Sequence, residues 1–239
     1  MSVLFISGID TDIGKTYATA MIAKALMQQG VNVITQKLVQ TGVSINCDTG
    51  EMNIADDIVT HRQLMNIPLQ PCDLDYTTCP YRYKKPASPH LSAALVNDVL
   101  DPKVITKTTQ QLQQSYDTIL LEGAGGLLVP MTKQLLTLDY IAQVGYRVIL
   151  VTSGRLGSIN HTLLSLEAIK ARGLTLHSVI YNHIHDSAAQ TDDEIANSTM
   201  DFLQNYLAQH YPNAHWLTLP VQKDNGSKSR DFSLPKNFV

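Results

Sequence analysis

A glycine-bounded loop between a short apolar run and a helical pattern constrains the fold of this chain more than any other feature. Val3–Ser7 is an apolar run that predicts a buried strand, and apolar residues at helical spacing predict a helix over Lys15–Gln29. Between them lies Gly8–Thr16, which ends in the tripeptide Gly-Lys-Thr. A glycine loop that follows a strand and opens a helix is the context that a phosphate-binding loop requires.

The residues of this loop suit a bound polyphosphate. Backbone N–H groups of a tight loop and of a helix N-terminus point at phosphate oxygens. Lys15 adds a positive charge for the β- and γ-phosphates, and the Thr16 hydroxyl can ligate Mg²⁺. Five residues separate Gly8 from Gly14, where the common loop has about four. The alternative is an ordinary strand–helix turn that contains glycine, but the position, order and flanking periodicity favour nucleotide binding.

Strands and helices alternate along the rest of the chain, which predicts a mostly parallel β-sheet with helices on both faces. The strands expected after the first are Val31–Gln36, Thr118–Leu121, Val148–Thr152, Leu176–Tyr181 and Trp216–Leu219. The helices expected after the first are Ile54–Met65, Leu91–Leu100, Pro102–Ser115, Asn160–Arg172 and Asp192–His210. No linker divides the chain, so we expect residues 1–239 to form one α/β domain, with residues 222–239 as a flexible C-terminal tail.

Composition argues against several classes of protein. With 239 residues and a formal net charge of −3, the chain lacks the basic character that binding to duplex nucleic acid requires. Its three cysteines (Cys47, Cys72 and Cys79) form no CxxC pair, which favours reduced thiols over a zinc site or a disulfide framework. The N-terminus lacks the features of a signal peptide, and no uninterrupted apolar run approaches about 18 residues. We therefore expect a cytoplasmic protein that binds neither nucleic acid nor a membrane.

Three polar residues follow predicted strands, at the edge of the sheet where α/β proteins bind ligands. Glu122 is a candidate Mg²⁺ ligand opposite Thr16, and the alternative is a helix N-cap partner. Lys37 would add a second positive charge near a transferring phosphoryl group, although a lone lysine after a strand is usually a solvated surface charge. The Asn182 amide can pair with an adenine edge through one donor and one acceptor, or it ends a strand in a turn.

Five sequence blocks occur in an order that one known family shares. Gly8–Thr16 (GIDTDIGKT) is similar to the signature G-T-D-T-(D/E)-V-G-K-T. The later blocks are Lys37–Gly42 (with Leu38 in place of the usual proline), Pro86–His90, Glu122–Gly126 and Leu156–His161. Together they resemble the dethiobiotin synthetases, a branch of the P-loop proteins related to the MinD-type ATPases. The resemblance runs from residue 8 to about residue 182, and the ordered combination is specific although no single block is.

The resemblance implies the P-loop NTPase fold and an ATP-dependent ring closure, in which 7,8-diaminononanoate and CO₂ give dethiobiotin, ADP and phosphate in biotin biosynthesis. It also implies Mg²⁺ as cofactor and a homodimer whose substrate site lies near the interface. The competing interpretations are a MinD-like switch and a P-loop kinase of small metabolites. A switch carries a further lysine near the start of the loop, which Gly8–Thr11 lacks, and a kinase leaves Glu122–Gly126 and Pro86–His90 unexplained.

The resemblance further implies roles for individual residues. The catalytic residues are Lys37 and Lys15. The residues implied to bind ATP are Asp12, Ile13, Gly14, Lys15, Thr16, Tyr17, Glu122, Gly123, Ala124, Gly125, Asn182 and Pro220. The residues implied to contact the diamine are Thr11, Thr41, Gly157, Ser158, Ile159 and Asn160. The Mg²⁺ ligands are Thr16, Glu122 and either Asp56 or Asp57, between which the sequence does not decide.

Overall fold

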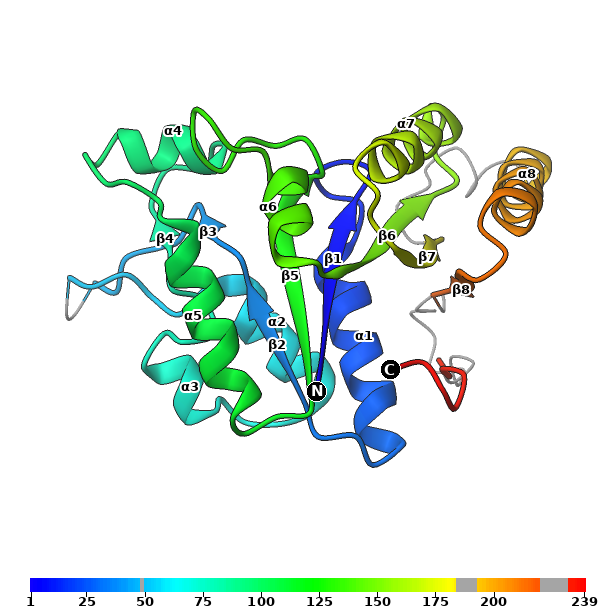
Figure 1. The fold of residues 1–239 in the computed structure, drawn as a ribbon. Helices are drawn as coiled ribbons and strands as arrows, with labels where there is room; N and C mark the ends of the chain where they lie inside the picture. Colours follow the sequence, from blue (N-terminus) through cyan, green and yellow to red (C-terminus); the bar gives the residue numbers. More distant parts are fainter. Residues whose placement is uncertain (48–49, 184–192, 220–231) are drawn as a thin grey trace.

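A six-stranded parallel sheet forms the centre of the molecule (Figure 1). The structure is a computed structural model, and it describes residues 1–47, 50–183, 193–219 and 232–239. The strand order is β2-β5-β1-β6-β7-β8. The bounds are Ser2–Gly8 (β1), Val33–Lys37 (β2), Thr118–Gly126 (β5), Arg147–Ser153 (β6), Leu176–Asn182 (β7) and His215–Thr218 (β8). The prediction of a mostly parallel sheet is therefore confirmed.

Helices cover both faces of the sheet because successive strand residues point to opposite sides. On one face, Leu4, Ile6 and Leu120 pack against helix α1 (Lys15–Gln28), and Met65 of helix α2 (Asp56–Met65) joins the same cluster. On the other face, Phe5 and Leu121 pack in a cluster with buried side chains from five helices, one of which is α4 (Pro89–Ala94). The other four are α5 (Pro102–Gln113), α6 (Thr137–Val144), α7 (Ser158–Ala171) and α8 (Asp193–His210).

The register of the sheet brings three strand ends together. Lys37, the last residue of β2, pairs with Glu122 of β5, and Ile6 of β1 pairs with Glu122 from the other side. All three strands are parallel, so their carboxyl ends meet at one edge. Gly8, which opens the glycine loop, ends β1 at this edge. This arrangement places the loop, Lys37 and Glu122 beside one another.

A smaller two-stranded sheet lies beyond this edge. It pairs β3 (Gln40–Thr41) with β4 (Arg82–Tyr83), and the short helices α3 (Pro71–Leu74) and α4 (Pro89–Ala94) flank β4 in the sequence. The expected helix Leu91–Leu100 is thus shorter and begins earlier, because Pro89 occupies the first helical turn, where a missing N–H costs nothing. Helix α6 was not expected from the sequence, because its eight residues are too few to show a clear helical period.

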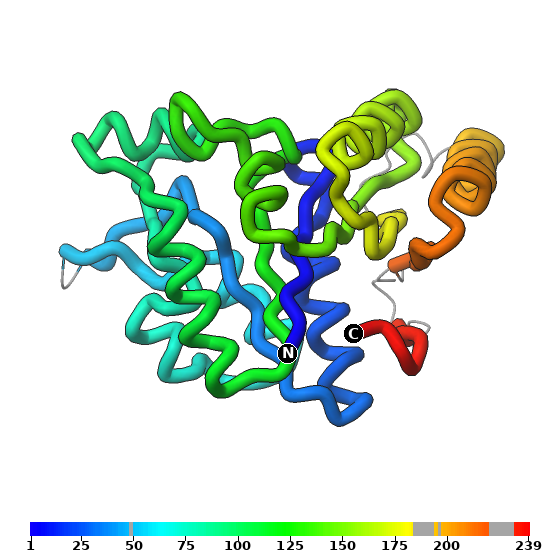
Figure 2. The backbone as a smooth tube through the Cα atoms, viewed as in Figure 1, coloured from blue at the N-terminus to red at the C-terminus, as the bar shows by residue number. Residues whose placement is uncertain are grey.

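The C-terminal residues differ from the expectation of a flexible tail. Residues 222–231 lie outside the described residues, but Phe232, Leu234 and Phe238 are buried in the same cluster as α1. Gln29, at the end of α1, donates a hydrogen bond from Nε2 to the Leu234 carbonyl at 2.8 Å. The final segment therefore lies beside α1, as the backbone trace shows (Figure 2). The expectation rested on the polar composition of the segment, whereas three of its apolar side chains are buried in the core.

In the described part of the chain, none of the helices combines the length and apolar character needed to span a bilayer.

Candidate active site

The loop Gly8–Thr16 is a compact turn built on glycine and on left-handed backbone. Gly14 has a φ of 89° and Asp12 a φ of 55°. A Cβ on Gly8 would lie 2.4 Å from Cγ2 of Ile13, so only glycine fits at that position. Ile13 is fully buried, and its carbonyl accepts a hydrogen bond from Nδ2 of Asn182 at 3.0 Å. The shape of the loop is therefore fixed by the close packing of Ile13 against Gly8 and by the hydrogen bond from Asn182.

Lys15 points back across the loop that precedes it. Its Nζ donates to the Asp10 carbonyl at 3.0 Å, and the residue is only 7% exposed. Burial disfavours the charged ammonium and the nearby Lys37 repels it, so the pKa of Lys15 is lowered to about 8. A bound polyphosphate would supply the negative charge that this lysine lacks.

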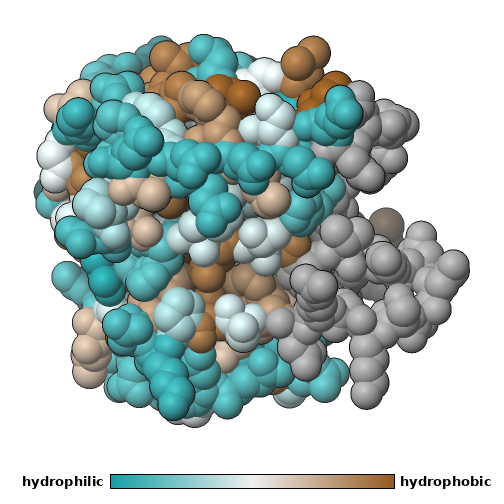
Figure 3. Space-filling view, turned by 90° about the vertical axis from the view of Figure 1, so that its right-hand side faces the viewer, coloured by the Kyte–Doolittle hydropathy of each residue, from teal (hydrophilic) through white to brown (hydrophobic). Residues whose placement is uncertain are grey.

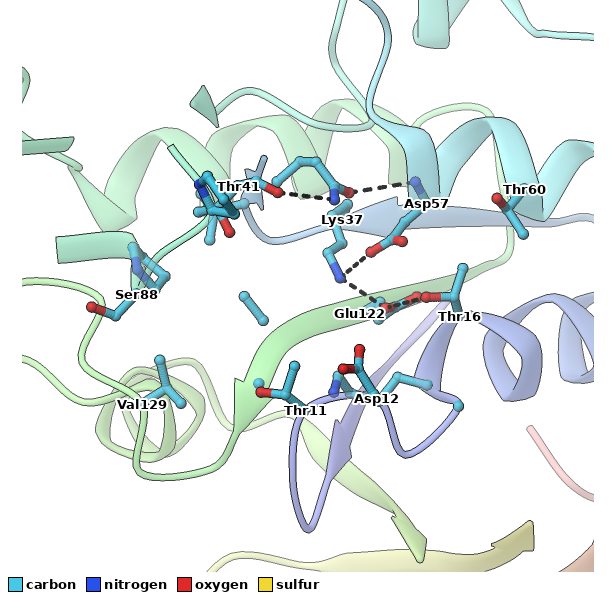
Figure 4. A pocket seen from close by; sticks show the side chains of 18 of the residues that line it. Thr11, Asp12, Thr16, Lys37, Thr41, Asp57, Thr60, Ser88, Glu122 and Val129 are labelled. Carbon is cyan, nitrogen blue, oxygen red and sulfur yellow. Dashed lines mark hydrogen bonds and ion pairs between the residues drawn. The ribbon is translucent and has the colours of Figure 1, made fainter. Parts of the chain in front are cut away.

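Lys37 lies between two carboxylates (Figure 4). Its Nζ is 2.8 Å from Oε1 of Glu122 and 3.0 Å from the Gly123 carbonyl, and it forms an ion pair with Oδ2 of Asp57. Thr16 completes the group by donating from Oγ1 to Oε1 of Glu122 at 3.2 Å. Loop, β2, β5 and α2 thus each contribute one polar side chain to one cluster.

The charges in this cluster stabilise one another. Burial opposes the charged form of both Lys37 and Glu122, but their mutual attraction outweighs it. The pKa of Lys37 is raised by the carboxylates of Glu122 and Asp57. The pKa of Glu122 is lowered by Lys37 and by His61. Lys37 therefore remains an ammonium and Glu122 a carboxylate at neutral pH.

Helix α2 is fixed by a second buried ion pair, below the cluster. Arg62 is 2% exposed and donates from Nε and Nη2 to the two oxygens of Asp73, each at 2.8 Å. Its Nη1 also donates to the hydroxyl of Thr35 on β2 at 2.7 Å. Two-pronged pairing of this kind fixes direction as well as distance. It sets the rotation of α2, which decides which of its side chains face the sheet edge.

That rotation separates the two adjacent aspartates. Asp57, Thr60 and Leu64 line the cavity at the sheet edge, at the spacing of one helix face. Asp56 is exposed and lies outside this lining, and its backbone carbonyl accepts a hydrogen bond from Oγ1 of Thr60. The structure brings Asp57 to Lys37 and leaves Asp56 on the surface.

The cavity has a volume of about 970 Å³, and the cluster forms part of its wall (Figure 4). The loop lines one side, and Thr41, Ser88 and Val129 reach it from other segments. Gly125 has a φ of 70°, and a Cβ there would lie 2.8 Å from Cγ2 of Val129. Glycine at this position lets the backbone pass close to the cavity wall.

Most of the residues implicated by the sequence line this cavity. They are Thr11, Asp12, Gly14, Lys15, Thr16, Tyr17, Lys37, Thr41, Asp57, Glu122, Ala124 and Gly125. Gly123 lies just behind it, with its carbonyl on Lys37. Ile13 and Asn182 are buried beneath the loop and hold its shape. Pro220 lies outside the described residues.

The segment Gly157–Asn160 does not line the cavity. Gly157 caps the N-terminus of α7 with a φ of 93°, and Ser158 is buried with its hydroxyl 3.2 Å from that of Ser153. In the first turn of α7, Ile159 is half-buried and Asn160 is exposed. An ion pair between Arg155 and Asp10 links the loop before α7 to the glycine loop. This ion pair connects the glycine loop to the segment that leads into Gly157–Asn160.

The oxygen ligands around Lys37 fit a magnesium ion. The Thr16 hydroxyl and the Glu122 carboxylate touch, and Asp57 reaches the same ammonium. Mg²⁺ takes oxygen ligands and is held by one or two carboxylates together with phosphate and water. Among the described residues, no group of three or more His, Cys, Asp or Glu side chains is placed to hold a metal ion by itself.

The structure adds two residues to the site that the sequence patterns did not indicate. His61 is fully buried and bonds Glu122, and Gln40 lines the cavity with its Oε1 3.4 Å from the Asp57 backbone N. Gln40 stands within the block Lys37–Gly42 and could have been singled out by its position. One feature of the sequence could have indicated His61: it follows Asp57 by four residues, so the two share a helix face.

Comparison with solved structures identifies the fold. A MinC:MinD cell division protein complex from Aquifex aeolicus matches with a TM-score of 0.52 and 18% identity, over 93% of this chain and 82% of that chain. A ParA family ATPase from Chlorobium tepidum matches with a TM-score of 0.54 and 16% identity, over 93% of this chain and 86% of that chain. At these identities the likeness concerns the fold, and it confirms the P-loop NTPase prediction.

Comparison with curated sequences identifies the family. A family described as an AAA domain matches residues 2–210. An ATP-dependent dethiobiotin synthetase from Haemophilus ducreyi is 48% identical over 220 residues, which cover 92% of this chain and 99% of that protein. One from Haemophilus influenzae is 54% identical over 180 residues, 75% of this chain and 90% of that protein. One from Chlorobaculum tepidum is 46% identical over 208 residues, 87% of this chain and 82% of that protein. The chain belongs to the ATP-dependent dethiobiotin synthetase family.

Proposed function

We propose that this protein is a dethiobiotin synthetase that uses ATP and Mg²⁺ to close the ureido ring of dethiobiotin from 7,8-diaminononanoate and CO₂. The observation that carries the proposal is the cluster of Lys15, Thr16, Lys37 and Glu122 at one sheet edge, in a chain about half identical to proteins of that name. The reaction class is a cyclo-ligation that forms C–N bonds.

The chemistry needs positioning and charge stabilisation rather than a nucleophile from the protein. One amine of the substrate adds to CO₂ as a carbamate, with loss of a proton. A carbamate oxygen then takes the γ-phosphoryl group of ATP and releases ADP. The second amine attacks the carbamate carbon, the ring closes, and phosphate leaves. Holding three reactants in line provides much of the rate, because it removes the entropy of bringing them together.

The two lysines serve this reaction as fixed positive charges. Lys15 is the partner of the β- and γ-phosphates, since its charge is only weakly compensated by the protein. Lys37 is held as an ammonium by Glu122 and Asp57, so it acts by charge and not as a base. Preorganised charges of this kind stabilise a transferring phosphoryl group.

Thr16, Glu122 and Asp57 are the residues that would hold the magnesium ion. When bound, the ion neutralises the phosphate oxygens of ATP. The backbone of Gly123–Gly125 and the loop residues Asp12–Tyr17 surround the nucleotide phosphates, and Thr11 and Thr41 offer hydroxyls to the diamine across the cavity. Asp57 rather than Asp56 takes the ligand role, because only Asp57 reaches the cavity.

We further propose a homodimer in the cytoplasm, with the substrate site near the interface. The N-terminus of α7 does not line the cavity of its own chain, although the resemblance assigns Gly157–Asn160 to substrate binding. Near it, Leu156 is 89% and Leu164 61% exposed. Figure 3 views the molecule from the side of α7 and α8, and apolar side chains gather toward its top. Sedimentation of a fully active monomer at micromolar concentration would exclude the dimer.

The proposed function is tested by the dependence of phosphate release on the second substrates. Water must be kept from the γ-phosphate until a carbamate is in place. We expect slow release with ATP and Mg²⁺ alone, a sharp rise with diaminononanoate and bicarbonate, and a return to the slow rate in CO₂-free buffer. A rate that diamine and bicarbonate leave unchanged would refute the synthetase and favour a MinD-like switch. Mass spectrometry of dethiobiotin formation identifies the product directly.

A further inference from the structure

His61 contacts the cluster from behind and has no role in the reaction described so far. It lies on α2 four residues after Asp57, is 0% exposed, and places Nε2 2.8 Å from Oε2 of Glu122. Its other ring nitrogen, Nδ1, is buried and has no hydrogen-bond partner among the described residues. The only polar contact that the described residues give this ring is therefore with Glu122.

The two oxygens of Glu122 are divided between different partners. Oε1 faces the cavity side, where it accepts from Lys37 at 2.8 Å and from Thr16 at 3.2 Å. Oε2 faces His61. An ionised carboxylate only accepts hydrogen bonds, so Nε2 of His61 is the donor to Oε2. Donors on both oxygens fix the plane of the carboxylate, and without His61 only Oε1 would be held.

A role in packing alone does not explain this histidine. Met65 anchors α2 in the core and Arg62 anchors it on Asp73 and Thr35, so the helix is fixed without His61. A buried ring nitrogen with no partner is unfavourable compared with an apolar side chain of similar volume. The imidazole is accounted for by the hydrogen bond it gives to Glu122.

We propose that His61 is a positioning residue, which orients the Glu122 carboxylate so that Oε1 faces Thr16 and the divalent cation that accompanies ATP. The inference rests on the proposed function, because it takes Glu122 as a cation ligand. Groups that hydrogen-bond a metal-binding carboxylate change metal affinity by about 10–100-fold when they are removed. The expected defect is therefore in cation binding and not in nucleotide binding as such.

The test measures Mn²⁺ binding to the full chain in the presence of ADP, from the electron paramagnetic resonance signal of the unbound ion. Mn²⁺ suits the oxygen ligands that hold Mg²⁺. His61→Leu should weaken Mn²⁺ binding about 10–100-fold and leave metal-free ADP binding unchanged. His61→Gln should restore Mn²⁺ affinity to within about threefold of wild type, because its amide N–H reaches as far as Nε2 and can donate to Oε2.

His177→Leu is the matched control. His177 is also buried and its Nε2 lies 2.7 Å from the Phe238 carbonyl, but it lies on β7 and lines no part of the cavity. The substitution His177→Leu removes a comparable buried hydrogen bond, so it should lower the stability of the protein without changing its Mn²⁺ affinity. If His61→Leu does not fold, His61→Asn takes its place, because the asparagine side chain is too short to reach Oε2 of Glu122. The Asn variant should then bind Mn²⁺ as weakly as expected for His61→Leu.

Glu122→Gln separates this inference from the proposed function. Weak Mn²⁺ binding by Glu122→Gln and by His61→Leu, with recovery in His61→Gln, supports the positioning role. Weak binding by Glu122→Gln with normal binding by His61→Leu overturns the role of His61 and leaves Glu122 as a ligand. Normal binding by Glu122→Gln overturns both. Equal losses in His61→Leu, His61→Gln and His177→Leu would show a general effect on stability and also overturn the inference.

Discussion

Replacing Lys37 by methionine removes one charge from the centre of the cluster and keeps most of the side-chain volume. The residue is 4% exposed and Glu122 is 0% exposed, so solvent cannot take over the lost interaction at Glu122. Asp57 differs, because its side chain is 23% exposed and water can replace part of its ion pair. The main effect of the substitution should therefore arise from the buried Glu122 carboxylate.

The size of this effect follows from the remaining partners of Glu122. Removing one member of a buried ion pair destabilises a protein by about 3–5 kcal/mol. His61 and Thr16 still donate to Glu122, which places the expected loss near the lower end, at about 3 kcal/mol. A divalent cation that binds the two carboxylates would offset the loss by about 2.7 kcal/mol at a concentration 100 times its dissociation constant. Activity should fall about 10²–10³-fold and should not recover with Mg²⁺.

Urea denaturation followed by fluorescence measures the stability change, because Trp216 is the single tryptophan of the chain. The unfolding free energies of wild type and Lys37→Met are compared with and without Mg²⁺, and phosphate release is measured on the same samples. Lys133→Met is the control, since Lys133 is exposed on a loop and its loss should change stability by less than about 0.5 kcal/mol. A Lys37→Met protein as stable as wild type, with no response to Mg²⁺, would refute the charge argument, and unchanged turnover would remove Lys37 from the reaction.

Three further outcomes follow from particular contacts. Asp57→Asn should lower kcat at least about tenfold, whereas Asp56→Asn should stay within about twofold of wild type, and equal losses in steady-state assays would contradict the separation of the two side chains. Gly8→Ala should abolish tight ATP binding and destabilise the fold by about 1–3 kcal/mol, because the new Cβ would lie 2.4 Å from Cγ2 of Ile13. Retained ATP affinity in a calorimetric titration would contradict this prediction. Burial and the charges of Arg147 and His215 lower the pKa of His177 to about 4, against the Phe238 carbonyl, which raises it. As the pH falls from about 6.5 to 4, the unfolded chain therefore binds a proton at this histidine and the folded chain does not, which lowers the free energy of unfolding by up to about 3 kcal/mol. Denaturation of His177→Gln measured against pH should lack this loss.

The glycine loop and the strand ends could be predicted because their signals are local. A strand, a glycine turn and a helix follow one another in sequence, and parallel pairing then forces Lys37 and Glu122 to the same edge. The choice between Asp56 and Asp57 is not local. It depends on the rotation of α2, which Arg62 sets through Asp73 and Thr35 in other segments. The buried face of α2 also carries His61 and Arg62, so hydrophobic periodicity does not reveal it.

The C-terminal segment illustrates the opposite limit. Its sequence is mostly polar, but Phe232, Leu234 and Phe238 each find an apolar site on the core. The sites belong to a cluster formed with α1 and the sheet, and His177 of β7 contacts the Phe238 carbonyl at 2.7 Å. Composition averages over the segment, whereas burial depends on single side chains and on the distant surface that receives them.

The two lysines of the site differ in how the protein compensates their charge. Lys37 has two carboxylates as ion-pair partners, and its pKa is raised despite burial. Lys15 forms no ion pair in the described part of the chain, contacts a backbone carbonyl, and has a pKa lowered to about 8. A buried cation without an ion-pair partner is unfavourable, and a bound polyphosphate would supply that partner. The unfavourable state of Lys15 in the free protein therefore contributes to the free energy of ATP binding. Lys37 gains less from an added anion because it is already paired. Lys15 is therefore suited to capture the nucleotide, and Lys37 to hold Glu122 and Asp57 in place until charge develops on the transferring phosphoryl group.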